Sequence, residues 1–379
     1  MGFSTPSKIQ ELTLPYLLDA SPRNIIAQSQ SGTGKTAAFS LATLSRINPN
    51  VKSVQALILA PTFELALQIG SVIENMARFM PHIRIAYAVR DANISKRGQL
   101  VRNQLLEENI VIGTPGTVEE YCRKKRVIDL KKLSMCVVDE ADIMISTQGF
   151  QEMCVNLVDG LDRTQCQMML FSATYSDEVM DFANNIIRNA IVLRLKREKQ
   201  TLTNICQYFI RCDNKEDKYE AIRQIYLNLT IGQVMIFCRT KANANELAVQ
   251  MNSENHVTGL LTSQLDVEQR AAVITRFRQG GFRVLVSTNV TARGIDIDDV
   301  SLVINYEMPL DMKGQPDFET YLHRIGRCGR FGRLGYTFNL IGSAKDYNIM
   351  KSIEQYFSHP IDEITIEGLS KLEQDENEH

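Results

Sequence analysis

The stretch Ala27-Gln28-Ser29-Gln30-Ser31-Gly32-Thr33-Gly34-Lys35-Thr36 follows a short apolar run and precedes a helical pattern. Glycines at such a junction let backbone N–H groups turn toward a polyphosphate, while Lys35 reaches the terminal phosphates and the Thr36 hydroxyl can ligate magnesium. Ser29 stands where the general pattern has its first glycine, so a Gly/Ser turn of similar composition is the alternative at this point. The stretch predicts a phosphate-binding loop between a strand and a helix.

Short apolar runs alternate with longer amphipathic stretches, which is typical of a parallel sheet wrapped by helices. In the first half these runs are Asn24–Ala27, Ala56–Ala60, Ile83–Val89, Ile110–Gly113, Met135–Val138 and Met168–Ser172. After Ile191–Leu195 the pattern restarts with Ile205–Arg211, Val234–Cys238, Gly259–Leu261, Val284–Ser287, Leu302–Tyr306 and Tyr336–Ile341. We therefore predict an α/β protein of two domains with one plan, residues 1–195 and 203–379.

The two halves are separated by a charged segment without an apolar face, beginning Lys196-Arg197-Glu198-Lys199. We interpret residues 196–202 as the linker, the alternative being a solvated helix end. The chain has 379 residues, a length that suits two domains rather than one ordinary core.

Composition narrows the class of protein. The chain is 44% hydrophobic and 23% charged, has no apolar run near the ~20 residues of a membrane span, and begins without a secretory pattern, so we expect a globular protein inside the cell with no membrane partner. Its eight cysteines include no C-x-x-C pair, so neither a zinc site nor a disulfide framework is predicted. The net charge of −2 argues against a generic polycation, and any phosphate-backbone site must be a local patch.

Several polar residues fall at or just beyond the ends of apolar runs. They are the phosphate loop, Thr62, Thr114, Asp139 and Ser172. In open parallel sheets ligands bind outside the carboxyl ends of the strands, so these residues can converge on one edge.

The run Val137-Val138-Asp139-Glu140-Ala141-Asp142 places three carboxylates after an apolar strand. Next to a phosphate loop, a carboxylate at a strand end holds magnesium and its neighbour orients the attacking water. We assign Asp139 to the metal and Glu140 to the water; a charged loop after a buried strand is the alternative.

The segment His323-Arg324-Ile325-Gly326-Arg327-Cys328-Gly329-Arg330 carries three arginines at three-residue spacing. Arginines can neutralise the charge that develops during phosphoryl transfer. A solvated basic face is the alternative. If these arginines belong to the second domain, they reach the phosphates only when the two halves close.

Taken together, the motifs make the chain resemble a DEAD-box RNA helicase over essentially its whole length. Gly2-Phe3 with Pro6-Ser7-Lys8-Ile9-Gln10 is similar to the adenine-sensing segment of that family, and Asp139-Glu140-Ala141-Asp142 is the sequence that names it. Similar matches follow at Ser172-Ala173-Thr174, from Ser287-Thr288-Asn289 to Asp296, and at His323–Arg330.

The resemblance implies two tandem RecA-like domains that use ATP and Mg²⁺ in an RNA-dependent ATPase reaction. It implies that Lys35, Glu140, Arg327 and Arg330 are catalytic, and that Phe3, Gln10, Ser31, Gly32, Thr33, Gly34, Lys35, Thr36, Asp139 and Asp296 bind the nucleotide and its metal, with Thr36 and Asp139 as metal ligands. It further implies that Pro61, Thr62, Thr114, Pro115, Gly116, Arg239, Thr288 and Gly294 contact RNA, and that Ser172, Thr174 and His323 couple the domains. Backbone contacts of this kind bind RNA without reading its sequence. For each threonine taken singly, a helix cap or a turn is the alternative.

The chain also departs from the general family pattern. Phe63 and Thr117 stand where most members have RNA-contacting arginines, Arg90-Asp91 replaces a usual glycine pair, and Cys328 replaces a usual threonine. Asp311–Asp317 lengthens the approach to the arginine segment. Together with Thr147-Gln148-Gly149 and Lys196-Arg197-Glu198, these features resemble the subfamily that remodels messenger ribonucleoprotein at the cytoplasmic face of the nuclear pore.

The subfamily resemblance implies a helicase of mRNA export, monomeric, active in the cytoplasm and nucleus, with nuclear-pore activator and scaffold partners and an inositol polyphosphate as a further ligand. The family usually has a base-stacking aromatic residue and, in this subfamily, an inhibitory extension upstream of Gly2-Phe3, so we expect weakened autoinhibition here. A translation-initiation helicase of the same family, and an RNA clamp that holds ATP with little turnover, are the two alternatives.

Overall fold

The computed structural model describes residues 5–21, 23–28, 33–90, 104–147, 149–193, 204–229, 232–289, 297, 300–311, 313–329, 334–369 and 372. The chain divides into two compact units, unit 1 (Met1–Leu195) and unit 2 (Lys196–His379), and each is described by itself. The predicted linker at 196–202 lies outside the described residues.

Unit 1 is built on a parallel sheet of seven described strands in the order β3-β4-β2-β5-β6-β1-β7. The strands are β1 (Ile25–Gln28), β2 (Ala56–Leu59), β3 (Ile85–Ala88), β4 (Ile110–Gly113), β5 (Met135–Val138), β6 (Gln167–Ser172) and β7 (Ile191–Leu193). Five of them, β1, β2, β4, β5 and β6, are buried at every residue, because helices cover both faces of the sheet.

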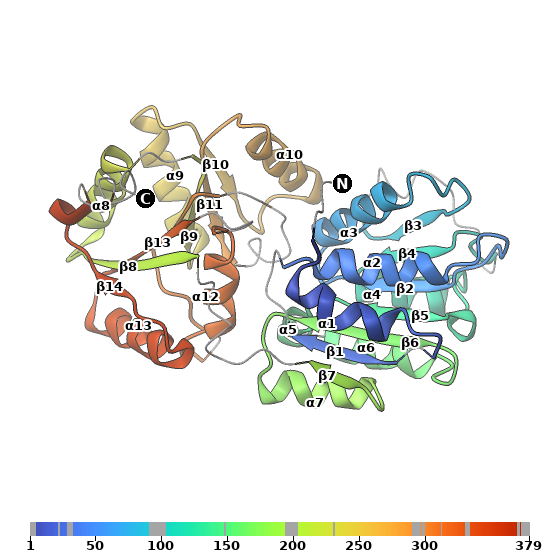
Figure 1. Cartoon of the computed structure of the whole chain (residues 1–379). Coiled ribbons are helices and arrows are strands. Elements are labelled where there is room, and N and C mark those ends of the chain that lie inside the picture. The colour runs from blue at the N-terminus through green and yellow to red at the C-terminus, as the bar shows by residue number, and fades with distance from the viewer. Residues whose placement is uncertain are drawn as a thin grey trace. The chain divides into compact units, whose positions relative to one another are not determined.

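Helix α1 precedes the first strand of unit 1, and the other helices of the unit lie between its strands in the chain (Figure 1). They are α1 (Lys8–Leu17), α2 (Lys35–Arg46), α3 (Phe63–Met76), α4 (Pro115–Glu119), the π-helical turn η2 (Glu120–Lys124), the 3-10 turn η3 (Leu130–Lys132), α5 (Ala141–Ser146), α6 (Phe150–Asp159) and α7 (Asp177–Ile186). On one face of the sheet Phe39 of α2 packs on Phe171 of β6, with ring centroids 5.5 Å apart. Because helices cover both faces of the sheet, polar loops can meet only at the ends of its strands.

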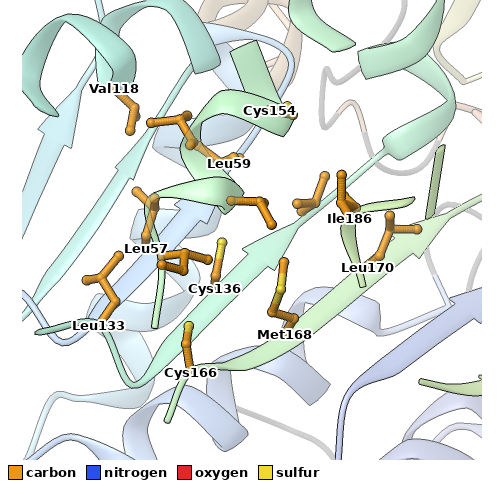
Figure 2. Close-up of a cluster of buried hydrophobic side chains, with 14 of the residues drawn as sticks. Leu57, Leu59, Val118, Leu133, Cys136, Cys154, Cys166, Met168, Leu170 and Ile186 are labelled. Carbon is orange, nitrogen blue, oxygen red and sulfur yellow. The ribbon is translucent and has the colours of Figure 1, made fainter. Parts of the chain in front are cut away.

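The other face of the unit 1 sheet carries a hydrophobic cluster, shown in Figure 2. Alternate residues of neighbouring strands, among them Leu57, Cys136 and Leu170, point into it and meet helix residues such as Cys154 and Ile186. None of the eight cysteines, all of which lie in the described ranges, forms a disulfide, and burial raises the pKa of the Cys154 thiol to about 12. The buried sulfurs of Cys136, Cys154 and Cys166 therefore pack as apolar atoms within this cluster.

Unit 2 repeats the plan with a second parallel sheet in the order β10-β11-β9-β12-β13-β8-β14. Its strands are β8 (Ile205–Arg211), β9 (Val234–Cys238), β10 (Thr258–Leu261), β11 (Val284–Thr288), β12 (Leu302–Asn305), β13 (Gly335–Ile341) and β14 (Asp362–Glu363). The described helical segments are α8 (Lys215–Asn228), α9 (Lys241–Ser253), α10 (Val267–Arg278), α12 (Phe318–Ile325), α13 (Ala344–Phe357) and the 3-10 turn η5 (Ile366–Gly368). One face packs on α8 and α9 and the other on α10, α12 and α13.

The two sheets have the same topology. Numbered within its own unit, each described strand of unit 2 takes the place of its counterpart in unit 1, in the order 3-4-2-5-6-1-7. The prediction of two α/β domains with mostly parallel sheets is thereby confirmed.

The structure differs from the predicted strands chiefly at their ends. The run Ile83–Val89 forms a strand only over Ile85–Ala88, and β14 was not predicted because two polar residues carry no apolar alternation. None of the helices within the described ranges has the length and apolar character needed to cross a membrane.

Candidate active site

The adjacent strands β5, β6 and β1 place the candidate nucleotide residues on one edge of the unit 1 sheet. Val138 pairs with Leu170, and Gln28 pairs with Ser172, so these strands end side by side. The acidic motif follows β5, the coupling motif ends β6, and the phosphate loop follows β1. The RNA candidates instead follow β2 and β4 on the other side of β5, so the same edge separates the two sets of residues.

The phosphate loop is described from Thr33 onward, and Ser31 and Gly32 lie outside the described residues. Gly34 has a φ of 94° and begins α2, whose first residue is Lys35. Lys35 is 6% exposed, and its Nζ has no hydrogen-bond partner within the described part of the chain. A buried ammonium group without a partner costs free energy, which indicates that Lys35 is placed to meet an anion.

The acidic motif lies against this lysine. Asp139 follows β5 directly, is buried, and accepts the backbone N–H of Glu140 at 3.0 Å. Burial raises the pKa of Asp139 to about 6, Lys35 opposes that rise, and the nearby Glu140 adds to it. The competition between burial and the Lys35 charge shows that the ammonium and this carboxylate share one electrostatic environment.

Glu140 turns the chain sharply from strand to helix. It has a φ of 50°, uncommon for a residue with a Cβ, and α5 begins at the next residue. The side chain is 5% exposed, and its Oε2 has no hydrogen-bond partner among the described residues. The residue after Asp139 therefore presents an unsatisfied acceptor, and both this carboxylate and the Lys35 ammonium act on the charge of Asp139.

Thr36 and Asp139 have the chemistry that a magnesium ion requires. Thr36 lies half-buried in the first turn of α2, and both residues offer hard oxygen atoms. No group of three or more His, Cys, Asp or Glu side chains in the described ranges has the arrangement of a metal site. Magnesium usually takes one or two protein ligands together with phosphates and water, so this small donor set fits it.

Gln10 lies on α1 against the phosphate loop. Its Nε2 donates to the carbonyl of Gly34 at 3.2 Å, and its Oε1 accepts the N–H of Ser7 at 2.9 Å. Phe3, the other candidate of this segment, lies outside the described residues. Gln10 thus joins the candidate adenine-sensing segment to Gly34, the N-cap of α2.

Replacing Gly34 by alanine is expected to lower both stability and nucleotide affinity. A Cβ there would lie 2.5 Å from Gln10 Nε2, and the φ of 94° is unfavourable for any L-residue, so we expect a loss of about 1–2 kcal/mol in the free energy of unfolding. Gly280→Ala is the matched control, because Gly280 has a φ of 73° and nothing within 4 Å of the new Cβ. Chemical denaturation should show a loss for both variants, and titration with a fluorescent ATP analogue a loss for Gly34→Ala alone; equal nucleotide affinity in the two variants would contradict the steric argument.

The candidate coupling residues contact the acidic motif directly. The Asp142 N–H donates to Ser172 Oγ at 3.3 Å, and Thr174 Oγ1 donates to Asp142 Oδ2 at 3.2 Å. All three residues are buried. The end of β6 is therefore hydrogen-bonded to the first turn of α5, the helix that follows Glu140.

The RNA candidates of unit 1 begin two helices. Thr62 caps α3 and accepts the N–H of Leu65 at 3.2 Å, so its hydroxyl already has a structural role. Thr114 precedes α4 without a side-chain cap; its Oγ1 lies 3.4 Å from Thr117 Oγ1. Pro61, Pro115 and Gly116 complete this set at the ends of β2 and β4. Phe63 is buried as the first residue of α3, and Thr117 is buried in α4.

In unit 2 the RNA candidates follow β9 and β11, which are neighbours in the sheet. Arg239 follows β9 and is exposed, and Thr288 ends β11. Gly294, the ribose candidate Asp296 and the arginine Arg330 lie outside the described residues. The arrangement repeats unit 1, where the strands that carry RNA candidates are also adjacent.

The arginine segment follows β12. His323 lies in the last turn of α12, and Arg327 follows the C-cap Gly326 and donates from Nε to the His323 carbonyl at 3.1 Å. Cys328 fills a fully buried position, with its Sγ 3.3 Å from the carbonyl of Ile325.

Two residues of unit 2, Arg324 and Glu307, make buried contacts near the candidate site that the sequence did not indicate. Arg324, which received no separate role, is fully buried and donates from Nη1 to Asn305 Oδ1 at 2.7 Å and to the Glu307 carbonyl at 2.8 Å. Glu307 was missed, although its position after an apolar strand is the same signal that identified Asp139.

Comparison with known proteins gives consistent matches. A family model for the DEAD/DEAH box helicase matches residues 7–182, and one for the helicase conserved C-terminal domain matches residues 217–332. ATP-dependent RNA helicase DDX19A of Homo sapiens is 50% identical over 373 residues, which are 98% of this chain and 77% of that protein. The structure of S. cerevisiae Dbp5 bound to RNA and ADP BeF3 is 40% identical with a TM-score of 0.90 and covers 99% of this chain and 94% of that one. A point variant of S. cerevisiae Dbp5 bound to Nup159, a Gle1 variant, IP6 and ADP is 38% identical with a TM-score of 0.71, covering 99% and 95%.

Proposed function

Because the chain belongs to the DEAD/DEAH box helicase family, we propose that it is an ATP-dependent RNA helicase of mRNA export that remodels ribonucleoprotein. The reaction is RNA-dependent hydrolysis of ATP to ADP and phosphate. The observation that carries this function is the buried pair of unsatisfied atoms, Lys35 Nζ and Glu140 Oε2, beside the carboxylate of Asp139 at one sheet edge. A purely structural site would have paired these groups with each other or with the backbone.

Each residue at this edge has a defined task. Lys35, with the backbone of Ser31, Gly32, Thr33 and Gly34, binds the phosphates of ATP, while Gln10 and Phe3 bind the adenine. Thr36 and Asp139 would hold Mg²⁺, which would neutralise negative charge on the phosphates of ATP. Glu140 orients the water that attacks the γ-phosphate and accepts its proton.

Unit 2 supplies the remaining nucleotide contacts when ATP and RNA are both bound. Arg327 and Arg330 then stabilise charge on the γ-phosphate, and Asp296 binds the ribose. His323, Ser172 and Thr174 link this closure to the acidic motif. The yeast relative bound to RNA and ADP BeF3 supports such a closed state.

RNA binding uses residues from both units. We assign contacts with the sugar–phosphate backbone to Pro61, Thr62, Thr114, Pro115, Gly116, Arg239, Thr288 and Gly294. Backbone and 2′-hydroxyl contacts are independent of base sequence, so the substrate is single-stranded RNA of many sequences. Phe63 and Thr117, buried where arginines are usual, reduce the number of cations available to the RNA backbone.

The partners and cellular site follow from the relatives. The yeast relative bound to Nup159, Gle1, IP6 and ADP supports a scaffold, an activator and an inositol polyphosphate as ligands of this chain. We accordingly propose that it acts in the cytoplasm and nucleus, at the cytoplasmic face of the nuclear pore.

Phosphate release with and without RNA tests the proposed function. We expect single-stranded RNA of two unrelated sequences to stimulate turnover to a similar degree, and DNA of the same sequences to stimulate far less, because the 2′-hydroxyl distinguishes RNA from DNA. If RNA is bound but turnover does not rise, the protein is an ATP-dependent RNA clamp instead.

A further inference from the structure

We propose that Glu307 is a positioning residue for RNA binding, which holds the start of the loop that carries Arg239. The inference rests on the proposed RNA function, and it assigns a role to a residue outside the motifs that identified the family. Glu307 lies just beyond the end of β12, and Arg239 lies just beyond the end of the neighbouring strand β9.

Both carboxylate oxygens of Glu307 contact Arg239. Oε2 accepts the backbone N–H of Arg239 at 2.8 Å, and Oε1 lies 3.4 Å from Nη2 of its guanidinium group. The Glu307 side chain is 11% exposed, whereas that of Arg239 is 43% exposed. The carboxylate is therefore the buried anchor, and the guanidinium group keeps donors available for a phosphate.

Glu307 is itself held in place by Arg324, a residue of the arginine segment. The main-chain carbonyl of Glu307 accepts a hydrogen bond from Arg324 Nη1 at 2.8 Å. The same guanidinium group donates from Nε to Asn289 Oδ1 at 3.1 Å and lies 5.2 Å from the centre of the Phe237 ring. Arg324 is fully buried. A carboxylate fixed in this way can hold its partner in one orientation before RNA arrives.

The pair differs from an ordinary surface ion pair of the same unit. Arg211 and Glu363 are joined at 2.7 Å, but their side chains are 56% and 49% exposed, and such pairs contribute little. Lys218 also lies near Glu307, but its Nζ donates to the Tyr306 carbonyl at 2.7 Å. Among these groups, Arg239 is the one whose main chain donates a hydrogen bond to the Glu307 carboxylate.

The test compares Glu307→Ala and Glu307→Gln with the control Glu363→Ala in the full chain. We expect Glu307→Ala to raise the RNA concentration for half-maximal ATPase about tenfold, the effect of losing roughly one hydrogen bond to a buried charged group. Glu307→Gln should lose less, because its amide oxygen can still accept the Arg239 N–H. At saturating RNA, the KM for ATP should not change in either variant, because the Glu307 main-chain contact with Arg324 is kept. Glu363→Ala should behave as wild type.

A double variant distinguishes positioning from a general loss of structure. If Glu307 acts through Arg239, then Glu307→Ala combined with Arg239→Ala should bind RNA no more weakly than Arg239→Ala alone. RNA half-saturation that is unchanged or tighter in Glu307→Ala would overturn the inference, as would equal losses of RNA affinity, ATP affinity and thermal stability. A wild-type chain whose ATPase does not respond to RNA would refute the RNA function itself, and the role of Glu307 with it.

Discussion

Glutamine in place of Glu140 is expected to lower ATP turnover about a hundredfold to ten-thousandfold, the contribution of a positioned general base. Glutamine has nearly the same shape, so the left-handed turn that begins α5 should be retained. It cannot accept a proton from water, and it brings an N–H₂ group to the place where the structure has an unsatisfied acceptor. ATP and RNA should still bind with near wild-type affinity.

Single-turnover phosphate release and separate nucleotide titration measure the two effects of Glu140→Gln. Glu107→Gln is the control, since it makes the same change on the surface of unit 1, where Glu107 pairs with Arg84 at 3.5 Å. Normal turnover in Glu140→Gln would refute the assigned role. Loss of ATP binding in parallel with turnover would indicate that Glu140 supports the fold of the site rather than the chemistry.

Replacing Lys35 by methionine is expected to separate stability from function. The ammonium group is buried without a hydrogen-bond partner in the described part of the chain, so removing its charge should leave the free energy of unfolding unchanged or higher. Turnover should fall about a hundredfold to a thousandfold, as for the loss of one preorganised donor at a developing charge. ATP affinity should fall as well, because a charge-assisted contact with phosphate is lost and Asp139 loses the cation that favours its ionised form.

Lys218→Met is the matched control for this variant. Lys218 is also buried, but its Nζ donates to the Tyr306 carbonyl, so its loss should lower the free energy of unfolding by about 1–3 kcal/mol and leave ATP affinity unchanged. Denaturant titration and binding of a fluorescent ATP analogue give the two readouts. If Lys35→Met destabilises the protein while nucleotide affinity is kept, Lys35 is a structural residue and the proposed phosphate site is wrong.

The fold class could be predicted from the sequence because the strands of a parallel sheet are easy to recognise in it. Strands buried on both faces are continuous apolar runs, and chemical residues follow them at the carboxyl end. The strand that precedes Asp139 and the one that precedes Lys35 could both be located in this way. The two-residue strand β14 could not, since its pairing with β8 depends on tertiary contacts rather than on its own residues.

The contacts that side chains make within the site could not be predicted from the sequence. The hydrogen bond from Gln10 to Gly34 and that from Thr174 to Asp142 join residues separated by 24 and 32 positions, and no local pattern encodes them. The cap that Thr62 forms on α3 could, by contrast, be predicted from the local sequence, because threonine is a preferred N-cap residue. The same residue is also a proposed RNA contact. Glu307 was overlooked because an isolated carboxylate after a strand gains meaning only when its partner on the adjacent strand is known.

The central claim is that ATP and RNA together favour one closed state of the two units. Glu140→Gln permits the direct measurement, because ATP itself can then be used without turnover: ATP affinity is titrated with and without RNA, and RNA affinity with and without ATP. We expect each ligand to tighten the other by the same factor, between about 5-fold and 150-fold, since binding linkage is reciprocal. Affinities for ATP and for RNA that do not depend on each other would contradict the account.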